Sequence, residues 1–152
     1  MESEITSIKL AWEFLKRALR CLEEAKRHFD NPSHVVDYPL CITRAHECVE
    51  FSLKAALLLV GRRLPHTHDL SDVLTGAIKK FPEWFKEKVP SFAVHSKVMN
   101  VIKVYATYGY EPTSTPPKEL FKEHYANMCV KNAEDVWSNC HRLYHEIQSL
   151  KP

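Results

Sequence analysis

Glycine is scarce in this sequence, with only 3 among 152 residues. A hydrophobic content of 45% with so little glycine argues against a disordered chain and against a sheet-rich fold, and it favours a packed helical protein. A long apolar run is also missing, because the longest, Ala55 to Val60, is far too short to cross a membrane. No basic segment followed by an apolar one opens the chain, so we expect neither a signal peptide nor a membrane partner.

The sequence shows no strong excess of charge of either sign. Its formal net charge is +2, so any surface that binds nucleic acid must be local. The 5 cysteines are odd in number and contain no Cys-x-x-Cys spacing, which argues against a disulfide framework or a zinc site. We expect these cysteines to be small core residues in a reducing cytoplasm. At 17.7 kDa, residues 1–152 are expected to form one domain.

What the sequence does contain, between Pro39 and Leu70, is a long apolar helix followed by a cationic loop. Apolar or small residues recur along this helix at steps of four and three, and leucines widen the apolar surface beyond a single stripe. These positions are Ala45, Val49, Ser52, Leu53, Ala56, Leu57, Leu58, Leu59 and Val60. Such a broad surface predicts a central helix with neighbours on several sides.

A narrow polar seam runs down the same helix, with Arg44 and His46 beside it. Its members step by four, three and four, and they are Thr43, Glu47, Glu50 and Lys54. Glu50 and Lys54 have the favourable i,i+4 order, so a solvated edge or a subunit contact explains them without a ligand. Alternatively, a groove for a polar ligand is lined by Arg44, Glu47, Glu50 and Lys54, which would justify charge on so apolar a helix.

The loop after this helix is defined by its local chemistry. Gly61 is suited to end the helix in a left-handed conformation, and Pro65 prevents its continuation. Thr67 is predicted to cap the next helix, with Asp69 in its first turn. Between the two helix ends lie Arg62, Arg63, His66 and His68. A loop so rich in cations and donors suits phosphate.

The remaining segments also read as helices. Apolar periodicity predicts helices over residues 7–28 and 68–80, a short turn within 83–90, a fourth helix from residue 92 that ends at Gly109, and a last helix that runs to the chain end. Residues 112–117, rich in proline, are expected to form an exposed linker. The predicted fold class is all-α, an antiparallel up-and-down bundle of about five helices.

The run from Arg44 to Leu74, which contains HECVEFSLKAALLLVGRRLPHTHDLSDVL, resembles the HEPN domain family, the higher eukaryotes and prokaryotes nucleotide-binding domain. The segment from Tyr105 to Glu111, YATYGYE, is a second point of similarity. The resemblance, to the stand-alone archaeal or bacterial type, implies a small helical bundle that binds nucleotide or single-stranded RNA. It also implies an accessory unit beside a minimal nucleotidyltransferase-like protein, in a toxin–antitoxin-like pair. We expect a homodimer in the cytoplasm.

Family members that act as ribonucleases use an arginine followed, after four to six residues, by a histidine late in the domain. Arg63 and His68 fit this spacing, as do Arg62 with His68 and Arg27 with His34, and with 9 histidines the spacing discriminates poorly. The late helix holds only Arg142 and His145, with two residues between them. We therefore expect no self-sufficient catalysis. A metal-independent ribonuclease, with Arg63 and His68 as its catalytic candidates, stays an alternative.

The predicted ligand-binding residues combine the seam, the loop and a possible stacking surface for a base. They are Arg44, Glu50, Lys54, Arg62, Arg63, His66, His68, Asp69, Tyr105 and Tyr108. At helical spacing the two tyrosines are more often core or subunit-interface residues than a stacking surface. A dimeric protein-interaction scaffold without any ligand is therefore a further alternative.

Two groups of possible metal ligands occur in the sequence. One is His66, His68 and Asp69, and the other is His141 with His145, one turn apart on a helix. Neither supplies an obvious set of three or four preorganised ligands. We therefore expect no resident metal and no cofactor.

Overall fold

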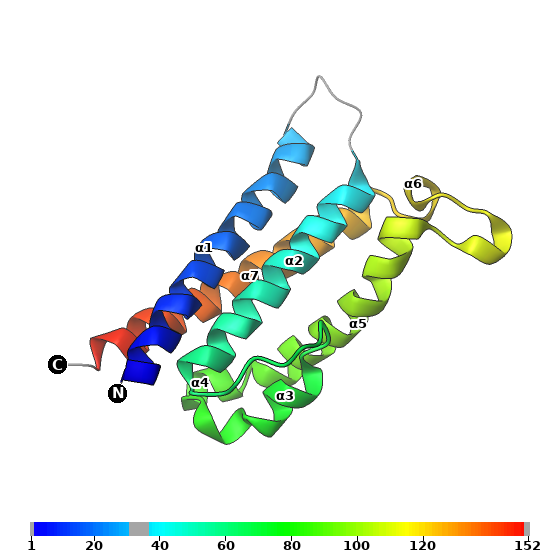
Figure 1. Cartoon of the computed structure of the whole chain (residues 1–152). Coiled ribbons are helices and arrows are strands. Elements are labelled where there is room, and N and C mark those ends of the chain that lie inside the picture. The colour runs from blue at the N-terminus through cyan, green and yellow to red at the C-terminus, as the bar shows by residue number, and fades with distance from the viewer. Residues whose placement is uncertain (1, 31–36, 151–152) are drawn as a thin grey trace.

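The computed structural model describes residues 2–30 and 37–150, and within them the side chains of residues 7–27 and 37–150. Its four long helices are α1 (Glu2–Asp30), α2 (Tyr38–Leu59), α5 (Val89–Tyr108) and α7 (Glu123–Ser149) (Figure 1). The short helices are α3 (Ser71–Gly76), α4 (Glu83–Lys86) and α6 (Pro117–Leu120), with 3-10 turns at Ile78–Lys80 and Glu111–Thr113. The described residues form no β-strand, so the predicted all-α helical bundle is confirmed.

Helix α2 lies at the centre of the bundle and packs against α1, α7 and α5 (Figure 1). Its large side chains Ile42, Val49, Leu53 and Leu57 are each at most 1% exposed. Full burial of such a side chain contributes about 1.5–3 kcal/mol, so α2 dominates the apolar core. The predicted central helix is therefore confirmed, and its breadth of apolar residues reflects three helical neighbours.

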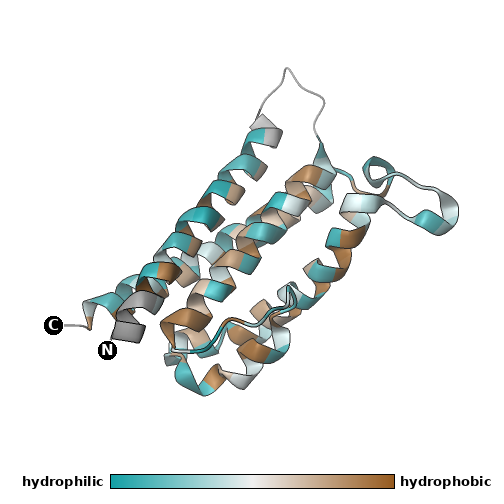
Figure 2. Ribbon diagram, in the orientation of Figure 1, coloured by the Kyte–Doolittle hydropathy of each residue, from teal (hydrophilic) through white to brown (hydrophobic). Residues whose placement is uncertain are grey.

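Helices α1 and α7 pack on one another as well as on α2. The indole nitrogen of Trp137 in α7 donates a hydrogen bond of 3.0 Å to the carbonyl of Leu15 in α1. Further along the contact between these two helices, Lys26 of α1 and Glu134 of α7 form an ion pair of 2.9 Å. The outward face of α1 is largely hydrophilic in Figure 2, as expected for an amphipathic helix with one buried stripe.

Two predicted elements were wrong in part. The third helix begins at Ser71, not at residue 68, because the carboxylate of Asp69, rather than Thr67, accepts hydrogen bonds from the amide and hydroxyl of Ser71 at 3.0 and 2.7 Å. It also ends at Gly76, and a 3-10 turn replaces its last residues. Within the expected linker, Pro117 starts α6, since proline is well suited to the first helical position.

Other local predictions are confirmed. Gly109 ends α5 with φ +79°, a conformation that favours glycine. All five cysteines are free and buried, as expected for small core residues. Burial raises the pKa of the Cys21 thiol to about 11 and that of Cys48 to about 12. Among the described residues, no helix is long and apolar enough to cross a membrane.

Candidate functional site

The loop that follows α2 begins with a tightly hydrogen-bonded turn at Gly61. The amide of Gly61 donates to the carbonyl of Leu58 at 3.0 Å, and the amide of Arg62 donates to that of Leu57 at 3.0 Å. Gly61 has φ +78°, as a left-handed helix terminus requires. Because these bonds satisfy the last carbonyls of α2, the side chains of Arg62 and Arg63 are free for other partners.

Those two arginines line a hollow of about 360 Å³ together with Lys80. The remaining wall is formed by Gly61, Pro65 and Val73, so the lining contains three cations and no acidic residue. Within the described part of the chain, neither arginine forms an ion pair or a side-chain hydrogen bond. The hollow therefore concentrates positive charge that no described carboxylate neutralises. Below we call it the cationic hollow.

The end of α3 leaves room for one of these arginines. An added Cβ at Gly76 would stand 3.4 Å from Nη2 of Arg62, so the guanidinium lies close against the end of that helix. Lys80 reaches the hollow from the 3-10 turn that follows. Lys80 is not among the residues predicted from the sequence, although the adjacent basic residues at the end of the third predicted helix were a usable signal.

His68 lies elsewhere in the loop and binds α2. Its Nδ1 is 2.7 Å from Oε1 of Glu50, whose other oxygen accepts a hydrogen bond from Lys54 at 3.3 Å. The side chain of Glu50 is only 10% exposed, whereas that of His68 is 66% exposed. Glu50 thus fastens the loop to α2, and neither His66 nor His68 lines the cationic hollow.

His46, beside the polar seam, is buried. Its side chain is only 2% exposed, and neither ring nitrogen has a hydrogen-bond partner among the described residues. Burial, and next the charge of Lys103, lower the pKa of His46 to about 4. The imidazole is therefore neutral at neutral pH.

Arg44 lies apart from the other predicted ligand-binding residues. Its Nε pairs with Glu24 of α1 at 2.9 Å and its Nη1 with Glu47 at 3.0 Å. Ten residues of helix, roughly 15 Å, separate Arg44 from Lys54. Arg44 therefore ties α2 to α1.

The tyrosines lie in a third place, at the C-terminal end of α5. The rings of Tyr105 and Tyr110 are 6.1 Å apart, and Tyr108 is 80% exposed. The loop is attached to α5 at Ser96, whose hydroxyl accepts a hydrogen bond of 2.9 Å from the amide of Leu70. Ser96 precedes Tyr105 by nine residues, or roughly 13 Å of helix. The predicted ligand-binding residues thus occupy three regions: the loop with the adjoining end of α2, the position of Arg44 beside α1, and the C-terminal end of α5.

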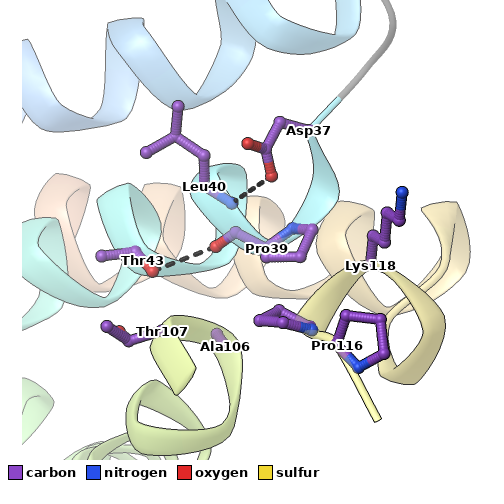
Figure 3. A pocket seen from close by; sticks show the side chains of 9 residues that line it. Asp37, Pro39, Leu40, Thr43, Ala106, Thr107, Pro116 and Lys118 are labelled. Carbon is purple, nitrogen blue, oxygen red and sulfur yellow. Dashed lines mark hydrogen bonds between the residues drawn. The ribbon is translucent and has the colours of Figure 1, made fainter. Parts of the chain in front are cut away.

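A second, larger hollow of about 670 Å³ lies between the start of α2, the end of α5 and the segment before α6 (Figure 3). Asp37 caps α2 by accepting a hydrogen bond of 3.0 Å from the amide of Leu40, and the Thr43 hydroxyl donates one of 3.0 Å to the carbonyl of Pro39. Lys118 is the one basic residue of its lining, which is otherwise mainly apolar or neutral. This hollow is therefore less suited to phosphate than the cationic hollow.

The catalytic candidates Arg63 and His68 do not share a hollow. Arg63 lines the cationic hollow, whereas His68 binds Glu50 on the adjoining face of α2. In the described residues, no three His, Cys, Asp or Glu side chains lie close enough together to hold a metal ion. This arrangement is therefore better suited to binding an anion than to placing a general base beside one.

Comparison with known protein families gives a match over most of the chain. A model of the HEPN domain matches residues 11–143. No curated protein and no solved structure matches the sequence. The matched range includes α2, the loop after it and most of α7, and HEPN domains are nucleotide- or RNA-binding modules.

Proposed function

The chain belongs to the HEPN domain family, and from this premise we propose that it binds a nucleotide or the phosphates of single-stranded RNA at the loop Arg62–Asp69. The cationic hollow is the observation that carries the proposal. Arg62, Arg63 and Lys80 line it without a neighbouring acid, and the arginines have no partner among the described residues. One guanidinium group can donate two parallel hydrogen bonds to two oxygens of a phosphate, which strengthens binding and fixes the orientation of the ligand.

Each part of the loop then has its own task. The arginines and Lys80 contact phosphate, while the bond between His68 and Glu50 and the bond between Leu70 and Ser96 hold the loop in place. A loop fixed before binding loses less conformational entropy when the ligand arrives. Neutralising three phosphates of a single strand gives a salt dependence with a slope of roughly −2 in log K against log salt.

Calorimetric titration with ATP and with a short single-stranded RNA, at low and moderate salt, tests the proposal. Arg62→Ala/Arg63→Ala should abolish binding, and Lys80→Ala should weaken it by roughly tenfold, the value of one charge-assisted hydrogen bond. Lys118→Ala, in the larger hollow, is the matched control and should leave binding unchanged. Unaltered binding by the double variant would show that the site is wrong.

The same samples address the ribonuclease alternative. RNA recovered after titration should be intact, because His68 is engaged by Glu50 and does not face the hollow. Metal-independent cleavage that disappears in His68→Ala would instead establish Arg63 and His68 as a catalytic pair.

The family resemblance further supports a role beside a minimal nucleotidyltransferase-like protein, in a toxin–antitoxin-like pair in the cytoplasm. We propose that residues 1–152 act there as a single domain. Co-expression with the product of an adjacent nucleotidyltransferase reading frame, followed by co-purification, is the test. The absence of any such neighbouring gene, or failure of the two proteins to associate, would count against this role.

Self-association is a second candidate, and an exposed stripe on α5 favours it. Val94, Val98, Val101 and Val104 are 60%, 48%, 55% and 54% exposed and recur at steps of four and three. The polar seam, in contrast, is occupied by ion pairs within the chain. The exposed stripe on α5 is therefore a better candidate for the contact of a homodimer than the polar seam.

Light scattering at micromolar concentration tests this interface. Val101→Glu should convert a dimer into a monomer, because a charge would be buried at the centre of the contact. Glu50→Lys separates the two faces, since the seam predicts that it dissociates the dimer and the α5 stripe predicts that it does not. A wild-type protein of monomer mass would remove this candidate.

A further inference from the structure

Two histidines of α7 point their ring nitrogens at one another. His141 and His145 are four residues apart on one face of the helix, and their Nε2 atoms are 3.1 Å from each other. The proposed phosphate site uses neither residue. Because a hydrogen bond between two neutral imidazoles needs one Nε2 as donor and the other as acceptor, at least one lone pair faces the space between the rings.

Aromatic neighbours fix both rings. His141 stacks on Trp137 with centroids 4.6 Å apart and planes at 19°, and the ring of Trp12 of α1 lies 6.0 Å away, tilted by 34°. His145 meets Trp12 edge-on at 6.2 Å and Tyr144 at 5.3 Å. The pair is thus oriented before any ligand arrives, and His145 is exposed to solvent.

We propose that His141 and His145 bind a divalent transition-metal ion, with copper(II) preferred over nickel(II) and zinc(II). With metal–nitrogen bonds of about 2.05 Å, two cis ligands lie roughly 3.3 Å apart in tetrahedral geometry and roughly 2.9 Å apart in square-planar geometry. The observed 3.1 Å lies between these values. The distance between the two nitrogens therefore already suits a shared ion, and a rotation of each ring about its Cβ–Cγ bond would aim both lone pairs at that ion.

Coordination replaces the hydrogen bond between the rings. The ring that donates moves its proton from Nε2 to Nδ1, and each Nε2 then gives a lone pair to the metal, so two neutral rings release no proton. No third described ligand joins the pair, and water completes the coordination shell. Two protein ligands make an exchangeable site, and imidazole affinity follows the order that places copper(II) highest.

Tryptophan fluorescence gives a direct readout, because Trp12 and Trp137 both contact the pair. Titration of the tag-free protein with copper(II) should quench the emission with a midpoint in the micromolar range. His145→Ala and His141→Gln should each weaken binding at least tenfold, while His124→Ala, an isolated exposed histidine near the start of α7, should behave as the wild type. Copper(II) should also raise the melting temperature of wild type but not of His145→Ala.

A variant of the two loop histidines tests whether copper(II) binds in the loop and not at α7. His66→Ala/His68→Ala must keep the full quenching if copper(II) binds at α7. Quenching that persists in His145→Ala, quenching that is lost in the loop variant, or no saturable quenching up to millimolar copper(II) would each overturn the proposal. Because His145 is exposed, its alanine variant should fold, as a circular dichroism spectrum and a melt without metal would verify.

Discussion

Acid should destabilise this protein through His46, and replacing His46 should remove most of that effect. The ring is buried between α2 and its neighbours with no hydrogen-bond partner among the described residues. Burial, then Lys103 and His68, disfavour the charged form, and only Glu50 favours it. A proton on His46 therefore costs the folded state far more than the unfolded one.

The sign and size follow from the two pKa values. The pKa of His46 is about 4 in the folded protein against 6.5 for a free histidine, so between these values the unfolded chain binds more protons. The stabilisation is complete above the higher value and is lost as the pH falls towards the lower one. By linkage the loss reaches about 2.5 kcal/mol near pH 4.5, a large part of the stability of a small domain.

Urea unfolding of wild type and His46→Leu near pH 7 and near pH 4.5 measures the effect. Near neutral pH the two free energies of unfolding should agree within about 1.5 kcal/mol, because leucine is of similar size and removes two unpaired nitrogens. At the acidic pH the variant should be the more stable, since only the wild type has a buried group to protonate. Parallel pH profiles would refute the reasoning, because all other titrating groups are common to both proteins.

The remaining predictions concern the turn at Gly109, the loop anchor and the thiols. Gly109→Ala should cost at least about 2 kcal/mol in urea unfolding, because φ +79° with ψ −163° suits only glycine and an added Cβ would collide with the carbonyl oxygen of Thr115. Gly61→Ala should cost only about 1 kcal/mol, because an added Cβ there would have nothing within 4 Å. Equal costs for the two variants would contradict this account. Glu50→Gln should lower the free energy of unfolding by about 1–3 kcal/mol and speed amide hydrogen exchange in residues 66–70, because it weakens the bonds to His68 and Lys54. Glu83→Gln, at an exposed ion pair, should change neither the stability nor the exchange rate. Unaltered exchange in Glu50→Gln would show that Glu50 does not anchor the loop. The five buried thiols should be inert to Ellman's reagent near pH 8 until the protein unfolds, and rapid reaction of the native protein would show that the core is open.

Periodicity was enough to predict the long helices, because each buries a stripe that recurs at helical spacing. It predicted the centre of the bundle as well, since α2 is apolar on more sides than one neighbour can cover. The start of α3 could not be predicted in the same way. Thr67 and Asp69 both have side-chain oxygens that can accept a backbone amide, and only the folded backbone determines that Asp69 accepts the amide of Ser71 whereas Thr67 accepts that of Asp69.

The candidate site shows the same division between local and tertiary information. Arg62 and Arg63 were predicted because helix termination and charge are adjacent in sequence. Lys80 was missed because the fold after α3 brings it to them. His68 was assigned to a ligand, yet in the structure its partner is Glu50, 18 positions earlier, and no sequence pattern distinguishes those two roles.

The central place of α2 also has a consequence for how the chain is made. Helix α1 can contact α2 as soon as both leave the ribosome, whereas the face of α2 that meets α7 must wait until α7 is synthesised. Until then, part of the most apolar segment of the protein lacks its cover and is open to chaperones or to aggregation. The cover of α2 is therefore completed only after translation of α7, and nascent chains that stall before α7 should be more readily captured by chaperones than those that stall after it.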